Sequence, residues 1–134
     1  MVKGSCHCKK VEFEIAEEEL SVRYCYCETC RKLSGGDYSS VARVDSCKFN
    51  ITQGKESLIS YESRPGKNRY YCPNCFSPIY VTTNNELSFL RVRLGLIDGE
   101  PKVTVTGHMW VSEKPNWCLI KDELPIYEYE YTGK

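Results

Sequence analysis

The sequence lacks the features that would place a protein in a membrane or on a polyanion. No uninterrupted apolar run approaches the ~18 residues that a membrane-spanning helix needs. Charge of one sign is not in excess either, because 18 basic and 18 acidic residues give a formal net charge of zero. No stripe of lysine and arginine runs along the chain. Membrane and nucleic-acid partners are therefore not expected.

The N-terminal residues, from Met1 to Cys6, lack the apolar segment of a secretory signal. We therefore expect a cytoplasmic, reducing environment, in which closely spaced thiols are metal ligands or catalytic groups more often than disulfide partners. The count of nine cysteines is odd in any case. The length of 134 residues and the 41% hydrophobic content predict one folded domain, residues 1–134.

Signals for β-strands dominate the chain. Residues 11–15 alternate apolar and charged side chains with a period of two, and residues 90–94 repeat this pattern around Arg91 and Arg93. Each pattern predicts a half-buried strand. Further strands are expected at residues 38–44, 47–52, 57–61, 69–71, 79–83 and 102–106.

The remaining signals are an edge strand and very little helix. Residues 126–131 alternate tyrosine and isoleucine with glutamate, which predicts an edge strand. The only helix expected is one or two short turns at residues 28–33, ended by Ser34 and two glycines. The sequence therefore predicts an all-β fold.

Seven of the nine cysteines form three clusters at the spacing of metal ligands. The clusters are Cys6 and Cys8, then Cys25, Cys27 and Cys30, then Cys72 and Cys75. In C-x-x-C, a tight turn lets two thiolates converge on one ion, and in an extended C-x-C both side chains point to the same face. His7, between two of these cysteines, is expected to face away. The spacings predict zinc.

A closed tetrahedral site needs two such pairs. Cys6 and Cys8 together with Cys72 and Cys75 supply four ligands for a structural zinc, which would link the N-terminus to the middle of the chain. Bound zinc of this kind contributes folding free energy directly.

The remaining cluster of Cys25, Cys27 and Cys30 has no obvious fourth ligand. Three ligands and an open position are typical of a catalytic zinc, and a thiol substrate in that position would be held as its thiolate. Alternatively, Cys47, Cys118 or His108 closes the site, or the three thiols carry out redox chemistry without metal. If Cys47 and Cys118 are not ligands, we expect them in the core.

Four ordered blocks of sequence together point to a known family. They are Gly4-Ser5-Cys6-His7-Cys8, Cys25-x-Cys27-x-x-Cys30-Arg31-Lys32, Ser63-x-Pro65-Gly66-Lys67-x-Arg69 before Cys72-x-x-Cys75, and His108-x-Trp110-Val111. In these blocks the chain resembles the glutathione-dependent formaldehyde-activating enzyme family, whose domain is shared with centromere protein V. Phe76 stands where the family usually has glycine, which predicts a different turn after Cys75.

The resemblance implies a fold, two metal sites and a reaction. The fold is a zinc-stabilised β-tent of twisted antiparallel sheets. Two Zn²⁺ ions per chain are implied, a structural one on Cys6, Cys8, Cys72 and Cys75 and a substrate-site one on Cys25, Cys27 and Cys30. The implied partner is a small thiol, glutathione, which adds to formaldehyde and gives S-hydroxymethylglutathione in a carbon–sulfur lyase-type reaction.

Other residues are weaker candidates for the same site. Arg31 can offset thiolate charge or hold a glutathione carboxylate, although a solvated role is equally open. His108 can act as an acid or base, although a hydrogen-bonded structural histidine is the more common outcome. Arg64, Lys67 and Arg69 are more simply explained by solubility of a turn. The alternative function is a non-enzymatic, zinc-stabilised binding or chaperone-like module.

Overall fold

The computed structural model describes residues 1–132, and β-strands dominate it. The strands are β1 (Val2–Ser5), β2 (Glu12–Ile15), β3 (Glu19–Cys25), β4 (Ser39–Asp45), β5 (Phe49–Gln53), β6 (Ile59–Arg64), β7 (Lys67–Tyr71), β8 (Pro78–Thr83), β9 (Phe89–Arg93) and β10 (Lys102–Met109). The one α-helix of this part of the chain, α1, spans Glu28–Ser34. Among residues 1–132, no helix has the length and apolar character needed to cross a membrane.

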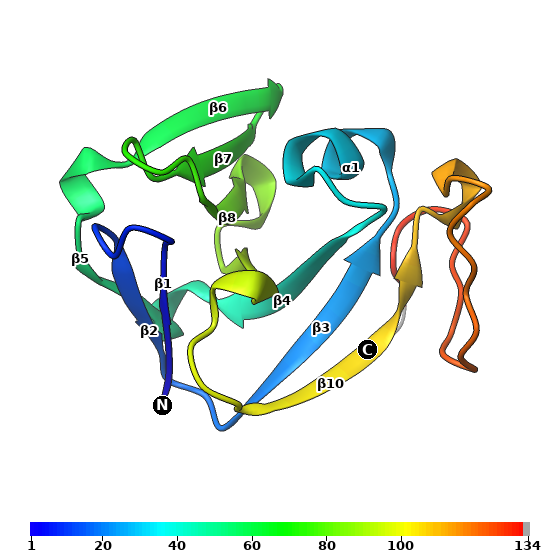
Figure 1. Cartoon of the computed structure of the whole chain (residues 1–134), viewed down its shortest axis with the longest axis horizontal. Helices are drawn as coiled ribbons and strands as arrows, with labels where there is room; N and C mark the ends of the chain where they lie inside the picture. The colour runs from blue at the N-terminus through cyan, green and yellow to red at the C-terminus, as the bar shows by residue number, and fades with distance from the viewer. Residues whose placement is uncertain (133–134) are drawn as a thin grey trace.

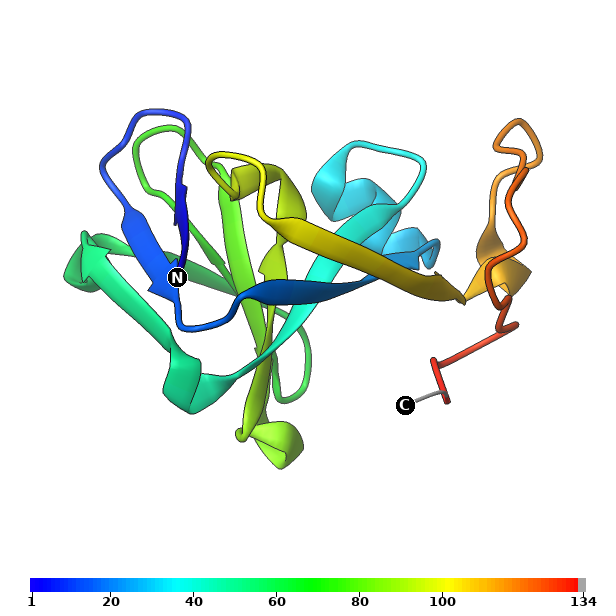
Figure 2. The ribbon, with the colours of Figure 1, turned by 90° about the horizontal axis from the view of Figure 1, so that it is seen from below.

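The strands form two sheets that face each other (Figures 1 and 2). The smaller sheet has the order β1-β2-β5, and the larger one β10-β3-β4-β9-β8-β7-β6. Neighbouring strands are antiparallel except for β10 and β3, which run parallel. The prediction of an all-β fold with one short helix is confirmed. After β10, the chain forms an arm on the outside of the larger sheet, drawn in orange and red in Figure 2.

The two faces of the larger sheet differ in character. Residues paired across neighbouring strands lie on the same face, so Val22, Ala42 and Val92 form one buried apolar row. This row packs in the core with Val2, Phe13 and other side chains of the smaller sheet. The core therefore lies between the sheets, and the opposite face of the larger sheet is left for other side chains.

The alternating strand at residues 90–94 is confirmed as β9, but its polar side does not face solvent. Arg93 pairs across to Val41 of β4 and is only 6% exposed. On β7, Arg69 pairs across to Val81 of β8 and is 3% exposed. An alternating pattern shows that a strand has two unlike faces, but it does not show what covers the polar one.

Two sequence predictions about the rest of the chain are wrong. Residues 126–131 form no regular strand: Ile126 makes an isolated bridge to His108, and beyond it the N–H groups of Trp110, Val111 and Ser112, at the left-handed turn that ends β10, donate to carbonyls of residues 127–129. Cys47 is exposed and Cys118 half-buried, so neither is an ordinary core residue. Strands β1 and β3 were not expected from the sequence.

The predicted helix is present as α1, and local capping explains both of its ends. The sulfur of Cys27 accepts a hydrogen bond from the Cys30 backbone N–H, which caps the first turn. Gly35 ends the helix in the left-handed conformation (φ 73°) that glycine adopts at little cost. The helix therefore follows β3 directly and holds its first turn beside the end of that strand.

Candidate functional site

The structure brings together the four cysteines that the spacing pairs. Cys6 and Cys8 come from the β1–β2 loop and Cys72 and Cys75 from the β7–β8 loop, and their sulfurs all lie within 4.8 Å of one another. The sulfur of Cys8 is 3.7 Å from those of Cys6 and Cys72. Tetrahedral Zn–S bonds of ~2.3 Å imply a separation close to this value, so the geometry fits one zinc ion.

Each of the two loops contains a left-handed residue directly after its second cysteine. These residues are Lys9 (φ 68°) and Phe76 (φ 61°). The Phe76 N–H donates to the Cys72 carbonyl at 3.0 Å, which closes the turn. Phenylalanine here adopts a left-handed conformation that suits glycine, with the strain that a side chain adds there.

The ionisation of these thiols favours a cation between them. Burial raises the pKa of Cys6 to about 11. At Cys75, burial is outweighed by hydrogen bonds from Ser77, and the pKa falls to about 5. Four thiols this close cannot all ionise alone, because each thiolate opposes the next. A divalent cation removes that opposition and allows all four to coordinate as thiolates.

The second cluster forms where β3 passes into α1. The sulfurs of Cys25, Cys27 and Cys30 lie within 4.8 Å of one another. Between the first two, the Tyr26 N–H donates to the Met109 carbonyl of β10 at 3.0 Å, which holds the C-x-C segment in an extended form. Hydrogen bonds from Cys25 and Cys27 lower the pKa of Cys30. Hydrogen bonds with Cys27 and Cys30, together with burial, raise the pKa of Cys25.

No fourth ligand joins this second cluster within residues 1–132. His108 uses both ring nitrogens elsewhere: Nε2–H donates to Asp122 at 3.0 Å, and Nδ1 accepts from the Tyr26 hydroxyl at 2.7 Å. The first of these bonds keeps the pKa of Asp122 below its usual value. Of the alternatives raised by the sequence, the structure therefore shows three thiols without a fourth protein ligand among the described residues.

One other residue predicted for the site, Arg31, lies outside it, whereas His7 was expected to face away from the metal. Arg31 is not among the residues that line the cavity described below, and its Nε donates to the Tyr26 carbonyl at 3.2 Å. His7 is exposed and takes no part in the donor clusters. Residues 6–8 are not extended, although their spacing had predicted an extended segment: the Lys9 N–H donates to the Cys6 carbonyl at 3.1 Å, and His7 lies in the turn that this bond closes.

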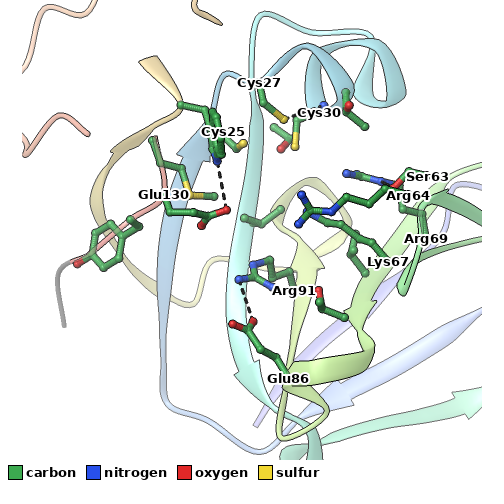
Figure 3. A pocket seen from close by; sticks show the side chains of 18 of the residues that line it. Cys25, Cys27, Cys30, Ser63, Arg64, Lys67, Arg69, Glu86, Arg91 and Glu130 are labelled. Atoms are coloured by element: carbon green, nitrogen blue, oxygen red, sulfur yellow. Dashed lines mark hydrogen bonds and ion pairs between the residues drawn. The ribbon is translucent and has the colours of Figure 1, made fainter. Parts of the chain in front are cut away.

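The three thiols open into a cavity of about 530 Å³, a volume in the usual range of small-molecule sites. Figure 3 shows the cysteines at one end and charged side chains along the neighbouring wall. The charged residues that line the cavity are Arg64, Lys67, Arg69, Arg91, Arg93, Glu86, Glu113 and Glu130.

Most of this charged wall was missed or given another explanation at the level of sequence. Arg91 and Arg93 looked like the solvent side of a strand, and Lys67 and Arg69 like a soluble turn. Burial lowers the pKa of both Lys67 and Arg93, as expected for cations removed from water. The signal in the sequence was the row of basic residues at alternate positions of two strands, β7 and β9.

Chemically, the cavity combines a thiol cluster that can hold a metal with a wall that favours anions. Apolar side chains complete the lining, among them Val41, Val81 and Met109. Such surroundings strengthen electrostatic interactions because they exclude water. A small molecule with a sulfur at one end and negative charge at the other matches both parts.

Comparison with known proteins agrees with this geometry. The sequence pattern of a family described as glutathione-dependent formaldehyde-activating enzyme matches residues 1–113. The chain belongs to this family. A relative from Halomonas elongata, named "Putative glutathione-dependent formaldehyde-activating enzyme", is 26% identical over 129 residues, which cover 90% of this chain and 82% of the relative.

Two further proteins extend the comparison for this member of the glutathione-dependent formaldehyde-activating enzyme family. An uncharacterized lyase of Schizosaccharomyces pombe is 26% identical over 114 residues, which cover 85% of this chain and 81% of the lyase. The crystal structure of a Rhodobacter sphaeroides protein matches with a TM-score of 0.60 and 23% identity, and the match covers 76% of this chain and 99% of that one. This last similarity shows a shared fold.

Proposed function

We propose that this chain is a zinc-dependent lyase-type enzyme that joins a small thiol, such as glutathione, to an aldehyde, such as formaldehyde. The observation that carries the proposal is the three-thiol cluster, which has no fourth ligand among the described residues and opens into a cavity of about 530 Å³. In the forward reaction a bond forms between the thiol sulfur and the carbonyl carbon. The S–H bond breaks, and its proton ends on the carbonyl oxygen.

The residues of the chain divide into two metal sites with different tasks. Cys6, Cys8, Cys72 and Cys75 hold a structural zinc, and Cys25, Cys27 and Cys30 hold a second one at the cavity. When bound there, zinc supplies the positive charge that keeps a coordinating thiol as its thiolate.

The surroundings of the second site determine how the thiol is held. The Cys27 sulfur is fixed by the Cys30 N–H at 3.3 Å, so the ligand cluster is positioned before substrate arrives. The Tyr26 hydroxyl, bound to His108, and its backbone N–H, bound to Met109, fix the segment from the other side. Because the three cysteine ligands are positioned in advance, the substrate thiol is expected to bind with its sulfur at the cluster and the rest of the molecule in the cavity.

Cys27→Ser tests the proposal, because serine also caps helices well and keeps α1 in place. We expect zinc-loaded protein to accelerate the exchange between glutathione and formaldehyde, measured by NMR exchange spectroscopy. The variant should lose at least about tenfold of this acceleration, as substitutions around metal sites commonly do. Zinc content should fall from two ions per chain toward one.

The matched control is Cys47→Ser, which changes an exposed cysteine outside both clusters. This control should keep the full acceleration and both zinc ions. An exchange rate that the zinc-loaded protein leaves unchanged would refute the lyase proposal and favour the binding-module alternative. Acceleration that Cys27→Ser retains would place the chemistry elsewhere.

A further inference from the structure

The cavity holds more positive charge than the thiol cluster can balance. Of its basic residues, Arg91 pairs with Glu86 at 3.6 Å. Within residues 1–132, no carboxylate lies within ion-pair distance of the other four, which are Arg64, Lys67, Arg69 and Arg93. A zinc ion with three thiolates carries one net negative charge. One of the four cations would be enough to balance it.

The remaining carboxylates of the cavity already have hydrogen-bond donors. Glu113 accepts from the Glu28 backbone N–H at 2.9 Å, and Glu130 accepts from Trp110 Nε1 at 3.2 Å. Both carboxylates are exposed, so water solvates them as well. They are therefore not available as close counterions for the arginines of the sheet.

Two of the four cations are buried, which makes their lack of a counterion costly. Arg69 is 3% exposed and Arg93 6% exposed. The Nε of Arg93 has no hydrogen-bond partner among the described residues, and that of Arg69 donates only to the Ser63 hydroxyl, at 3.0 Å. Buried arginines are almost always paired. An arginine that is buried, unpaired and on a cavity wall indicates an anionic ligand.

The strand register places these cations on one surface that leads to the thiols. Arg69 pairs across to Val81, and Val81 pairs across to Arg91, so the two arginines share a face with Arg93, two residues further along β9. From Arg93 the same face continues through its partner on β4 toward Cys25 at the end of β3. A single extended molecule on this face reaches both the arginines and the sulfurs.

We propose that Arg69 and Arg93, supported by Lys67 and Arg64, form an anion subsite that binds the carboxylates of an anionic thiol whose sulfur lies at the cysteine cluster. The choice of a thiol rests on the proposed function, whereas the anion preference rests on the unpaired arginines. Guanidinium groups bind carboxylates through paired, charge-assisted hydrogen bonds. The subsite therefore selects thiols with more than one carboxylate over neutral thiols.

Binding of S-methylglutathione to the zinc-loaded full chain tests the subsite without any chemistry at sulfur. By isothermal titration calorimetry at low salt, we expect the acid to bind at least tenfold more tightly than its dimethyl ester, in which both carboxylates are neutral. Affinity for the acid should fall with added sodium chloride, and affinity for the ester should not.

Arg69→Met and Arg93→Met should each weaken binding of the acid at least tenfold and leave the ester unaffected. Arg93→Lys keeps the positive charge but loses the planar guanidinium group. Its affinity for the acid should lie between those of wild type and Arg93→Met. Arg43→Met is the control, because Arg43 is exposed and stacks on Phe89 outside the cavity. Both methionine variants should melt no lower than wild type, because each removes an unpaired buried charge.

Equal affinities for acid and ester, or methionine variants that bind the acid like wild type, would overturn the subsite. A melting temperature that falls sharply in Arg93→Met and Arg93→Lys alike, with acid binding retained, would assign Arg93 a structural role instead. The lyase proposal fails separately: binding with this charge preference but no accelerated exchange leaves the subsite standing. If the protein accelerates the exchange equally well with neutral thiols, the lyase proposal stands and the anion subsite is refuted.

Discussion

Zinc at the four-cysteine site should act as a cross-link of the folded chain. Removing this cross-link should lower the free energy of unfolding substantially. It joins Cys8 to Cys72 across 64 positions of the sequence. The chain-entropy relation for a loop of this length gives about 4 kcal/mol. For a domain of this size, 4 kcal/mol corresponds to a fall in melting temperature of about 15 °C.

The double variant Cys8→Ser/Cys75→Ser isolates this effect. Both cysteines are half-buried, whereas the fully buried Cys6 and Cys72 stay in place, so core packing changes little. Thermal unfolding followed by circular dichroism under reducing conditions, with zinc measured on the same samples, should show one zinc per chain instead of two and the expected fall in melting temperature.

Cys47→Ser/Cys118→Ser is the matched double control, because it also replaces two cysteines but touches neither cluster. It should melt within about 3 °C of wild type, as surface substitutions usually do. If Cys8→Ser/Cys75→Ser loses one zinc ion and still has the same melting temperature as this control, the cross-link contributes no stability and the prediction is refuted.

Two backbone predictions concern residues close to the same site, Phe76 in the β7–β8 loop and Gly4 in β1. Phe76→Gly should raise the free energy of unfolding by about 0.5–1 kcal/mol, because glycine adopts the left-handed backbone without strain and the side chain that is removed is 67% exposed. The zinc content should not change, and a lower melting temperature would contradict the prediction. Gly4→Ala should lower the free energy of unfolding by about 1–3 kcal/mol, measured by urea unfolding, because its Cβ would overlap the Phe13 ring and lie 2.9 Å from the Leu96 carbonyl oxygen. Unchanged stability would mean that Phe13 can move aside.

The two cysteine clusters could be predicted from sequence because their geometry is largely local. A C-x-x-C turn or an extended C-x-C already sets the distance between its two sulfurs, so only the pairing of distant pairs had to be inferred. The short helix at residues 28–33 was predictable for the same reason, since Gly35 sets its end and the adjacent cysteines its start.

The charged wall could not be predicted, because it depends on how distant strands pair. The alternation around Arg91 and Arg93 is the same whether the polar face of β9 meets water or a cavity. Only the register with β4 and β8 shows that this face lies beside the thiols. The C-terminal alternation at residues 126–131 failed for a related reason, since its partner β10 ends at Met109 and residues 127–129 accept hydrogen bonds from the turn at residues 110–112 instead of from a strand.

The two cysteine sites are connected through the strand that carries part of the charged wall. Arg69 lies on β7, and Cys72 follows the end of that strand directly. A zinc ion that joined Cys72 to the β1–β2 loop would therefore fix the end of β7 against the rest of the molecule. Among the described residues the Arg69 Nε donates only to the Ser63 hydroxyl, so the place of this guanidinium on the cavity wall would depend on that rigidity. On the two proposals above, zinc at the four-cysteine site would thus serve both the stability of the fold and the binding of anions.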